Sequence, residues 1–383
     1  MAENRYQIPF NRPFFSDSAL KNIKHLIENK GSLEGGGYFT KKCQALLEEK
    51  FNVSKVLLTN SCTVALEMAA LLAGIEKGDE VVMPSYTFVS TANSVLMRGA
   101  VPVFVDININ DLNIDCESIK NAITGKTKAI VPVHYAGNPC CMDEINNIAE
   151  ENGLSVIEDA AQCINSFYKG KALGTFGDIG AVSFDWAKNI PVGECGAIYI
   201  NDESLHERGD IIIEKGTNRK AFRDGRIDRY GWMDIGSSYY PNELTAAFLY
   251  AQLEKADQIT ERRRYIWNKY HVFFKEYEEK GILRRPHIIE GGIGNAHIYF
   301  VLMDSREERN AFLRYLQENS ITALTHFVPL HSSPYGKKAA RTSGSMTVTD
   351  DVFQRSLRLP MYAMSESEID YILDVMESYF IKK

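Results

Sequence analysis

The chain of 383 residues carries 43 Lys and Arg against 50 Asp and Glu, a formal net charge of -7, and 45% of its residues are hydrophobic. This balance is typical of a soluble globular protein and argues against a general nucleic-acid binder, which would need a basic face. The length exceeds what one small core can organise and favours one large and one smaller domain.

The cysteines and the amino terminus indicate the compartment. The seven cysteines are irregularly spaced and form no CxxC pair, which favours reduced thiols over disulfides or a zinc site. The segment MAENRYQIPF lacks the apolar core of a signal peptide, and no apolar run approaches the roughly 20 residues that cross a bilayer. We therefore expect a cytoplasmic protein without a membrane segment and without a metal.

From about Phe39 to Asn201, helix-like and strand-like stretches alternate. The segment KKCQALLEEKF is amphipathic, and SCTVALEMAALLAG is typical of a helix that ends at a glycine. Short β-branched stretches, as in buried parallel strands, read SKVLLT, DEVVMP, VPVFVD, KAIVPVHY and LSVIED. This alternation predicts an α/β fold, a doubly wound domain with a mostly parallel sheet, whose ligand site lies at the carboxyl ends of the strands.

After Leu244 the pattern changes to one or two long amphipathic helices, which run to about residue 281. A strand and a helix follow, with the sequences NAHIYFVLM and REERNAFLRYLQENS. This part predicts a smaller C-terminal α+β domain. We place the boundary so that residues 1–260, with an N-terminal arm, form the large domain and residues 261–383 the small one.

Polar residues follow several predicted strands. The first strand ends at Ser61, Cys62 and Thr63, where a helix begins. Free N–H groups at a helix start, beside a hydroxyl, can bind a phosphate, although Ser61 or Thr63 would equally serve as a helix cap. Another strand ends at Asp159, with Gln162 three residues on; a buried carboxylate there could hold a protonated ring nitrogen or cap the next helix.

An aromatic residue and a lysine complete the pattern. Tyr86, Thr87 and Phe88 follow a third strand, where an aromatic ring could stack on a flat cofactor or belong to the core. Lys188 follows the strand GAVSF, and by itself would be read as a solvated lysine near a turn. A phosphate cradle, a ring-nitrogen carboxylate, an aromatic and a lysine together indicate a pyridoxal phosphate (PLP) site, with Lys188 as nucleophile and proton carrier.

Taken in order, these motifs resemble the DegT/DnrJ/StrS family of PLP-dependent nucleotide-sugar aminotransferases, which have the aspartate aminotransferase fold (fold type I). The resemblance covers nearly the whole chain, from IPFNRPFF to LRLPMY. It rests on LLTNSCTVALEMAALL, GDEVVMPSYTFVSTANSVLMRGA, VPVHYAGNPCCMD, VIEDAAQ, SFDWAKN, GECGA, EKGTNR, DIGSSYYPNELTAAFLYAQLE and PLHSSP. Within the family, GSSYYPNEL is most similar to the subgroup that makes dTDP-4-amino-4,6-dideoxygalactose.

That subgroup transfers an amino group from L-glutamate to the 4-keto carbon of dTDP-4-dehydro-6-deoxyglucose. The resemblance implies that Lys188 forms the Schiff base with PLP and that Asp159 contacts the pyridine nitrogen. Further cofactor contacts are implied for Gln162 at the ring hydroxyl, Phe88 on the ring face, and, at the phosphate, Cys62 (through its backbone), Thr63 and Ser183.

The resemblance also implies a homodimer with shared active sites, because in this family the neighbouring subunit completes each phosphate site from the GSSYY segment. Ser238 and Tyr240 would have this role, with Tyr240, His331 and Tyr86 at the substrate. His134 and Tyr135 would lie near the entrance. Each histidine could equally be a packed core residue.

Two residues depart from the family pattern, and several alternatives stay open. Asp185 adds a negative charge three residues before Lys188. Cys195 replaces a glycine, at a strain of about 1 kcal/mol if that position needs a positive φ. Relatives that dehydrate sugars have histidine in place of the lysine, so Lys188 favours transamination. The gluco epimer, a 3-keto acceptor, a lyase or decarboxylase, and a PLP-binding regulator without turnover remain alternatives.

Overall fold

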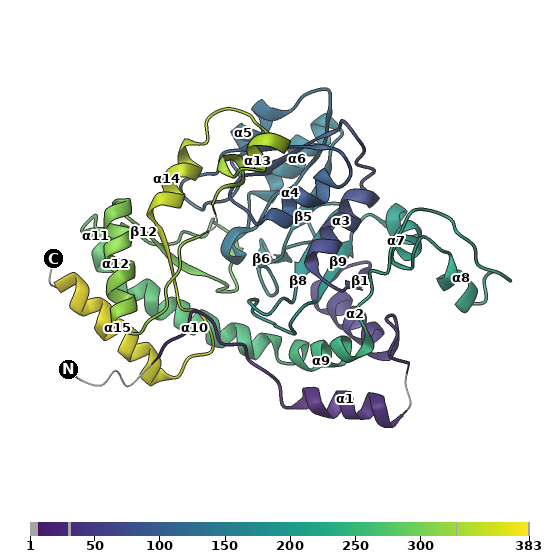
Figure 1. Ribbon diagram of the computed structural model, residues 1–383, viewed down its shortest axis with the longest axis horizontal. Helices are drawn as coiled ribbons and strands as arrows, with labels where there is room; N and C mark the ends of the chain where they lie inside the picture. Colours follow the sequence, from purple (N-terminus) through teal and green to yellow (C-terminus); the bar gives the residue numbers. More distant parts are fainter. Residues whose placement is uncertain (1–6, 30–31, 327, 382–383) are drawn as a thin grey trace.

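The computed structural model of the protein describes residues 7–29, 32–326 and 328–381. The first six residues, on which the expected lack of a signal peptide partly rests, lie outside this range. A large sheet with helices on both faces dominates the fold, and a smaller body lies beside it (Figure 1). None of the described helices is long and apolar enough to cross a membrane.

The large sheet has eight strands, in the order β1 (Val56–Thr59), β9 (Gly196–Ile200), β8 (Ile179–Ser183), β5 (Ser155–Asp159), β4 (Thr127–Ile130), β2 (Glu80–Pro84), β3 (Val101–Val105) and β13 (Arg341–Thr342). Only β9 runs antiparallel to its neighbours, β1 and β8. The remaining pairs are parallel, so the carboxyl ends of seven strands lie along one edge. The predicted mostly parallel α/β sheet is confirmed.

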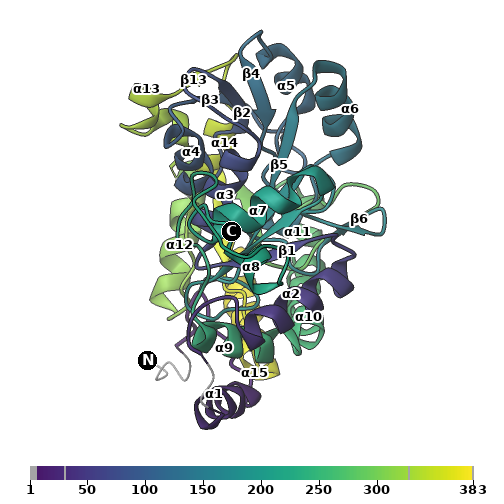
Figure 2. The same ribbon diagram turned by 90° about the vertical axis from the view of Figure 1, so that its right-hand side faces the viewer.

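Alternating side chains of the strands form two separate cores. Val56 and Leu58 of β1 pack into one core, whereas Leu57 packs into the other. The first core is covered by α2 (Tyr38–Phe51), α5 (Cys116–Ala122), α6 (Met142–Asn152) and α9 (Glu243–Leu253). The second is covered by α3 (Cys62–Leu72), α4 (Val89–Leu96) and α7 (His206–Ile213). Figure 2 shows α5 and α6 on one side of the sheet and α4 on the other.

The smaller body is built on an antiparallel sheet of β10 (Leu283–Arg284), β12 (Tyr299–Met303) and β14 (Ser356–Leu359). Its core takes side chains from α10 (Ala256–Phe273), α12 (Arg306–Glu318) and α15 (Glu366–Ile381), and also Ile8. Ile8 pairs through its backbone with Ser320 and Thr322. Because α10 itself spans residue 260, the boundary at that residue stays a prediction.

The remaining elements are short or peripheral. They are α1 (Ser18–Glu28), α8 (Arg219–Arg223), α11 (Lys275–Glu279), α13 (Gly336–Ala339), α14 (Thr347–Arg355), β6 (Phe167–Tyr168), β7 (Lys171–Ala172), β11 (Gly292–Ile293) and three short 3-10 turns. The long helical stretch expected after Leu244 is divided among α9, α10 and α11.

Glu158, the residue before Asp159 on β5, is fully buried and organises the neighbouring loop. Its carboxylate accepts hydrogen bonds from the N–H groups of Gly174 (2.8 Å), Phe176 (2.6 Å) and Gly177 (2.7 Å). It also accepts one from His134 Nε2 at 2.8 Å. The opposite ring nitrogen accepts from a backbone N–H at 3.1 Å, which fixes the proton on Nε2. His134 is therefore a packed core residue and not part of a cavity entrance.

We predict that Glu158→Gln destabilises the protein by about 3 kcal/mol, because one acceptor oxygen becomes an NH2 group facing buried N–H donors. Urea denaturation followed by circular dichroism measures the change. Glu150→Gln on the exposed face of α6 is the matched control and should change stability by less than about 0.5 kcal/mol. Equal urea midpoints for the two variants would contradict the stabilising role given to the Glu158 carboxylate.

Candidate active site

A cavity of about 550 Å³ opens at the carboxyl edge of the large sheet. Its walls come from the segments that follow β1, β2, β4, β5 and β8. Eight of the residues expected at the site line it: Cys62, Thr63, Tyr86, Phe88, Asp159, Gln162, Ser183 and Lys188. Tyr135 also lines it, whereas Ser238, Tyr240 and His331 do not.

The amino end of α3 forms one wall of the cavity. Ser61 caps the helix by accepting a hydrogen bond from Val64 N at 3.3 Å, and in the described part of the chain the N–H groups of Cys62 and Thr63 have no acceptor. The Thr63 hydroxyl lies 2.8 Å from the Ser90 hydroxyl. Burial raises the pKa of the Cys62 thiol, so this residue stays neutral and offers its N–H. Such a helix end is suited to a phosphate.

Asp159 also lines the cavity and is 5% exposed. Its Oδ1 accepts a hydrogen bond from Ala161 N at 3.2 Å, and its Oδ2 accepts one from the Thr91 hydroxyl at 2.7 Å. Residues 160–166 form turns, so the alternative that Asp159 caps a following helix does not apply. The carboxylate is therefore free to contact a ligand in the cavity.

Lys188 lies in a tight turn after β8, and its backbone N–H donates to Asp185 O at 2.9 Å. Within the described residues, its Nζ has neither a hydrogen bond nor an ion pair. The Asp185 carboxylate instead accepts from Ala187 N at 3.0 Å, and Asp185 N donates to Ser183 Oγ at 3.3 Å. Asp185 thus shapes the turn without pairing with the lysine, and the amine stays available to a ligand.

Cys195 carries none of the strain that its replacement of a glycine suggested. It is absent from the residues with positive φ, and Gly193 at φ 96° supplies the left-handed conformation of that turn. The thiol is buried, lies 3.3 Å from Thr59 O, and has its pKa raised to about 12 by burial. The condition for that strain is not met, because the positive φ of this turn lies two residues earlier, at Gly193.

A buried amide network that sequence reasoning missed lies beneath the lysine. Asn189 Nδ2 donates to Asn295 O at 3.0 Å, and His297 Nδ1 lies 2.9 Å from Asn189 Oδ1. Asn295 Nδ2 donates to the carbonyl oxygens of Gln162 and Ile164, each at 2.7 Å. Residues 295–297 thus tie the turn after β5 to the turn that carries the lysine. Nothing local in the sequence signalled this link.

Among the residues that the structure describes, Gln162 uses only the oxygen of its side-chain amide. Its Oε1 accepts from Ala136 N at 2.7 Å, and this fixes the amide orientation. The Nε2 group therefore remains as a donor for a ligand, as the expected contact with the ring hydroxyl requires.

His326 is a second residue that sequence reasoning missed, while His331 lies elsewhere. The His326 ring lines the cavity, 4.7 Å from the Tyr86 ring and 4.9 Å from the Tyr135 ring. Burial, with nearby positive charges, holds its pKa well below the usual range. His331 Nδ1 lies 2.7 Å from Ser85 Oγ and its Nε2 3.3 Å from Asp350. It therefore holds the turn before Tyr86 and does not line the cavity.

Ser238 and Tyr240 lie outside this cavity. Ser238 is exposed, and its backbone forms an isolated antiparallel β-bridge with that of Glu214. Tyr240 packs so closely on Gly35 that a Cβ there would lie 2.3 Å from the Tyr240 Cβ. Their expected role in a neighbouring subunit's site stays a prediction.

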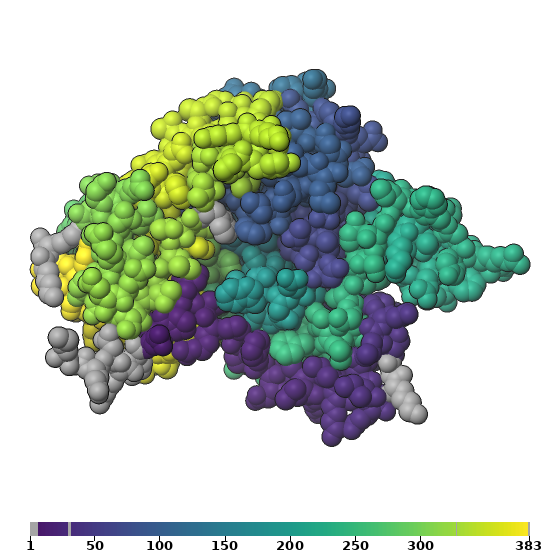
Figure 3. Space-filling model, viewed as in Figure 1, coloured from purple at the N-terminus to yellow at the C-terminus, as the bar shows by residue number. Residues whose placement is uncertain are grey.

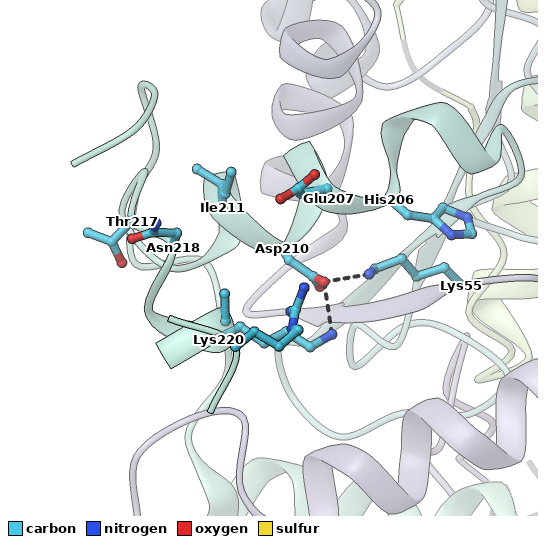
Figure 4. A pocket seen from close by; sticks show the side chains of 10 residues that line it. Lys55, His206, Glu207, Asp210, Ile211, Thr217, Asn218 and Lys220 are labelled. Carbon is cyan, nitrogen blue, oxygen red and sulfur yellow. Dashed lines mark hydrogen bonds and ion pairs between the residues drawn. The ribbon is translucent and has the colours of Figure 1, made fainter. Parts of the chain in front are cut away.

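A smaller cavity of about 170 Å³ lies at the amino end of β1, beside α7 and α8 (Figure 4). At its base Asp210 Oδ2 lies 2.7 Å from Lys55 Nζ and 2.9 Å from Lys220 Nζ. Burial lowers the pKa of Lys55, although Asp210 opposes this effect. Both lysine amines pair with Asp210, so this cluster joins α7 and α8 to the sheet and leaves neither amine free.

The large cavity fits PLP in the chemistry of its groups. The α3 end supplies donors for a phosphate, Asp159 an acceptor for a protonated ring nitrogen, and Lys188 an unpaired amine for the aldehyde. Among the described residues, no group of three or more His, Cys, Asp or Glu side chains could hold a metal ion.

Comparisons with known proteins agree with this reading. The sequence model of the DegT/DnrJ/EryC1/StrS aminotransferase family matches residues 16–377. The chain is 32% identical to the spore coat polysaccharide biosynthesis protein SpsC of Bacillus subtilis, over 96% of each chain. It is 31% identical to GDP-perosamine synthase of Escherichia coli O157:H7, over 98% of this chain and 99% of that protein.

Solved structures agree as well. The aminotransferase TlmJ from Streptoalloteichus hindustanus is 26% identical and superimposes with a TM-score of 0.89, over 98% of this chain and all of TlmJ (100%). The chain therefore belongs to the DegT/DnrJ/EryC1/StrS aminotransferase family, and it is a PLP-dependent sugar aminotransferase of fold type I.

Proposed function

We propose that the protein transfers the amino group of L-glutamate to the 4-keto carbon of dTDP-4-dehydro-6-deoxyglucose, giving dTDP-4-amino-4,6-dideoxygalactose, in two half-reactions at one site. One observation carries the transaminase chemistry: an unpaired Lys188 amine shares a cavity with Asp159 and the amino end of α3. When bound, PLP supplies the aldehyde and the electron sink that amino transfer needs.

Individual residues of the protein bind the phosphate, contact the ring nitrogen and transfer the protons. The N–H groups at the start of α3, with the hydroxyls of Thr63 and Ser183, bind the phosphate and so orient the ring. The buried Asp159 carboxylate would accept a hydrogen bond from the protonated ring nitrogen. Lys188 Nζ removes the proton at Cα of glutamate and returns one at C4 of the sugar. The side of the sugar that faces Lys188 then decides between the galacto and gluco epimers.

The nucleotide and the keto position are the least constrained parts of the proposal. The GSSYYPNEL segment supports the dTDP-linked acceptor by resemblance. A relative named GDP-perosamine synthase, 31% identical, makes a GDP-linked keto sugar the second candidate. The gluco product and a 3-keto acceptor are the further alternatives, and a regulator without turnover would bind PLP but transfer nothing.

We also propose a homodimer with shared active sites, in the cytoplasm. Residues 217–235 extend from the body as a projection that includes α8 (Figures 1 and 3). It exposes apolar side chains, among them Tyr230, Met233 and Trp232, the last 84% exposed. A cluster of this kind is typical of an interface, and Ser238 and Tyr240 follow directly. All seven cysteines are free thiols, which supports the cytoplasm.

We predict that Lys188→Ala abolishes both half-reactions, with a fall in rate of at least about a thousandfold, because no other lysine among the described residues lines the cavity. Stopped-flow absorbance with L-glutamate, and then with the keto sugar, measures each step. Lys77→Ala at an exposed position is the matched control and should behave as wild type. Retained turnover in Lys188→Ala would remove this residue from its role.

The acceptor is tested by offering the glutamate-treated holoenzyme three sugars in parallel. These are dTDP-4-dehydro-6-deoxyglucose, a GDP-linked 4-keto-6-deoxyhexose and a dTDP-linked 3-keto-6-deoxyhexose. We expect the first to restore the PLP absorbance fastest, and NMR of the product to show an axial amine at C4. Faster reaction with either other sugar would replace the proposed acceptor, and an unchanged spectrum after glutamate would favour the regulator.

The proposed dimer predicts a two-chain species in sedimentation velocity at micromolar protein concentration. Trp232→Glu should weaken it, because a charge would be buried at the interface. A single-chain species for the wild-type protein would contradict the shared active site.

A further inference from the structure

Two threonine hydroxyls in the wall of the large cavity form a hydrogen-bonded chain that ends at Asp159. Thr87, in the turn after β2, and Thr91, on α4, are 4% and 0% exposed. Their Oγ1 atoms lie 2.8 Å apart, and Thr91 Oγ1 lies 2.7 Å from Asp159 Oδ2. An ionised carboxylate only accepts, so Thr91 donates to Asp159, and the Thr87 hydroxyl must donate to Thr91. The direction of the chain is therefore fixed.

The two oxygens of Asp159 are held unequally. Oδ1 receives one backbone N–H at 3.2 Å, whereas Oδ2 receives the Thr91 hydroxyl at 2.7 Å. A short hydrogen bond to a charged acceptor is roughly twice as strong as a neutral one. Thr91 therefore contributes most to the orientation of the carboxylate within the protein, and it draws charge away from Oδ2.

We propose that Thr91, supported by Thr87, is a positioning residue for the contact between Asp159 and the ring nitrogen of PLP. The hydroxyl keeps the carboxylate turned toward the cavity and lowers its basicity, so that the shared proton stays on the ring nitrogen. This inference rests on the proposed role of Asp159 in the transaminase.

The hydrogen-bonded chain from Thr87 to Asp159 predicts which substitution should have the larger effect. Thr91→Val keeps the shape of the side chain but removes the donor to Oδ2, so the carboxylate becomes more basic and the proton moves toward it. Thr87 also lines the cavity, but its hydrogen-bonded link to Asp159 runs through Thr91, whose donor it strengthens. Thr87→Val should therefore have a smaller effect in the same direction, and the double variant should match Thr91→Val alone.

The test uses holoenzyme loaded with PLP labelled with 15N at the ring nitrogen, without substrate. We expect the 15N resonance of Thr91→Val to move toward the unprotonated position, and the glutamate half-reaction to slow by about tenfold. Thr91→Ser restores the hydroxyl and should return the resonance to the wild-type position. Ser94→Ala is the control for packing. Ser94 on α4 donates to Thr91 O at 2.8 Å but is not part of the hydrogen-bonded chain from Thr87 to Asp159.

Two results would overturn the proposal in different ways. A wild-type 15N resonance in Thr91→Val, with a slower reaction or a lower melting temperature, would leave the threonines a structural role only. Asp159→Asn serves as the reference variant. If it also leaves the resonance unchanged, the ring-nitrogen contact itself fails, and the proposed role of Asp159 fails with it.

Discussion

The parallel pairing of β5 with β8 fixes where Asp159 and Lys188, the two side chains proposed to act with PLP, lie. Asp159 pairs with Ala181, and the chain leaves β8 at Ser183 to form the turn that ends at Lys188. The pairing depends on close packing behind the sheet, where a Cβ on Gly180 would lie 2.2 Å from Gly174 O. Glu158 holds that loop in place through three backbone N–H groups. Successive residues of one strand thus point to opposite faces, Glu158 into the packed loop and Asp159 into the cavity.

The cavity separates charges that would otherwise neutralise one another. Asp185 is close to Lys188 in the chain, yet its carboxylate accepts from backbone N–H and leaves the amine unpaired. Burial keeps the Cys62 and Cys195 thiols protonated and lowers the pKa of His326 and of His297. Neutral thiols and low-pKa imidazoles therefore surround the Lys188 amine and the Asp159 carboxylate. Such an arrangement, set before a substrate arrives, is the main electrostatic source of catalysis.

The C-terminal half of the chain completes a site that the large sheet begins. Asn295 and His297 support the turns of Gln162 and Lys188 from below, and His326 packs against Tyr86 at the wall. Strand β13 also adds an edge to the large sheet, beside β3. Movement between the two bodies would therefore act directly on the turn that carries the lysine.

The sequence by itself determined the sheet, the start of α3, and the positions of Cys62, Asp159 and Lys188 at strand ends. Periodicity and capping are local, and a doubly wound sheet brings its carboxyl ends together. Only the tertiary structure decided that Asn295 and His326 belong to the site, that His331 does not, and that Cys195 is unstrained. Asn189 and Asn295 are 106 residues apart. Contacts over such a separation depend on how the two bodies pack, and no local pattern encodes them.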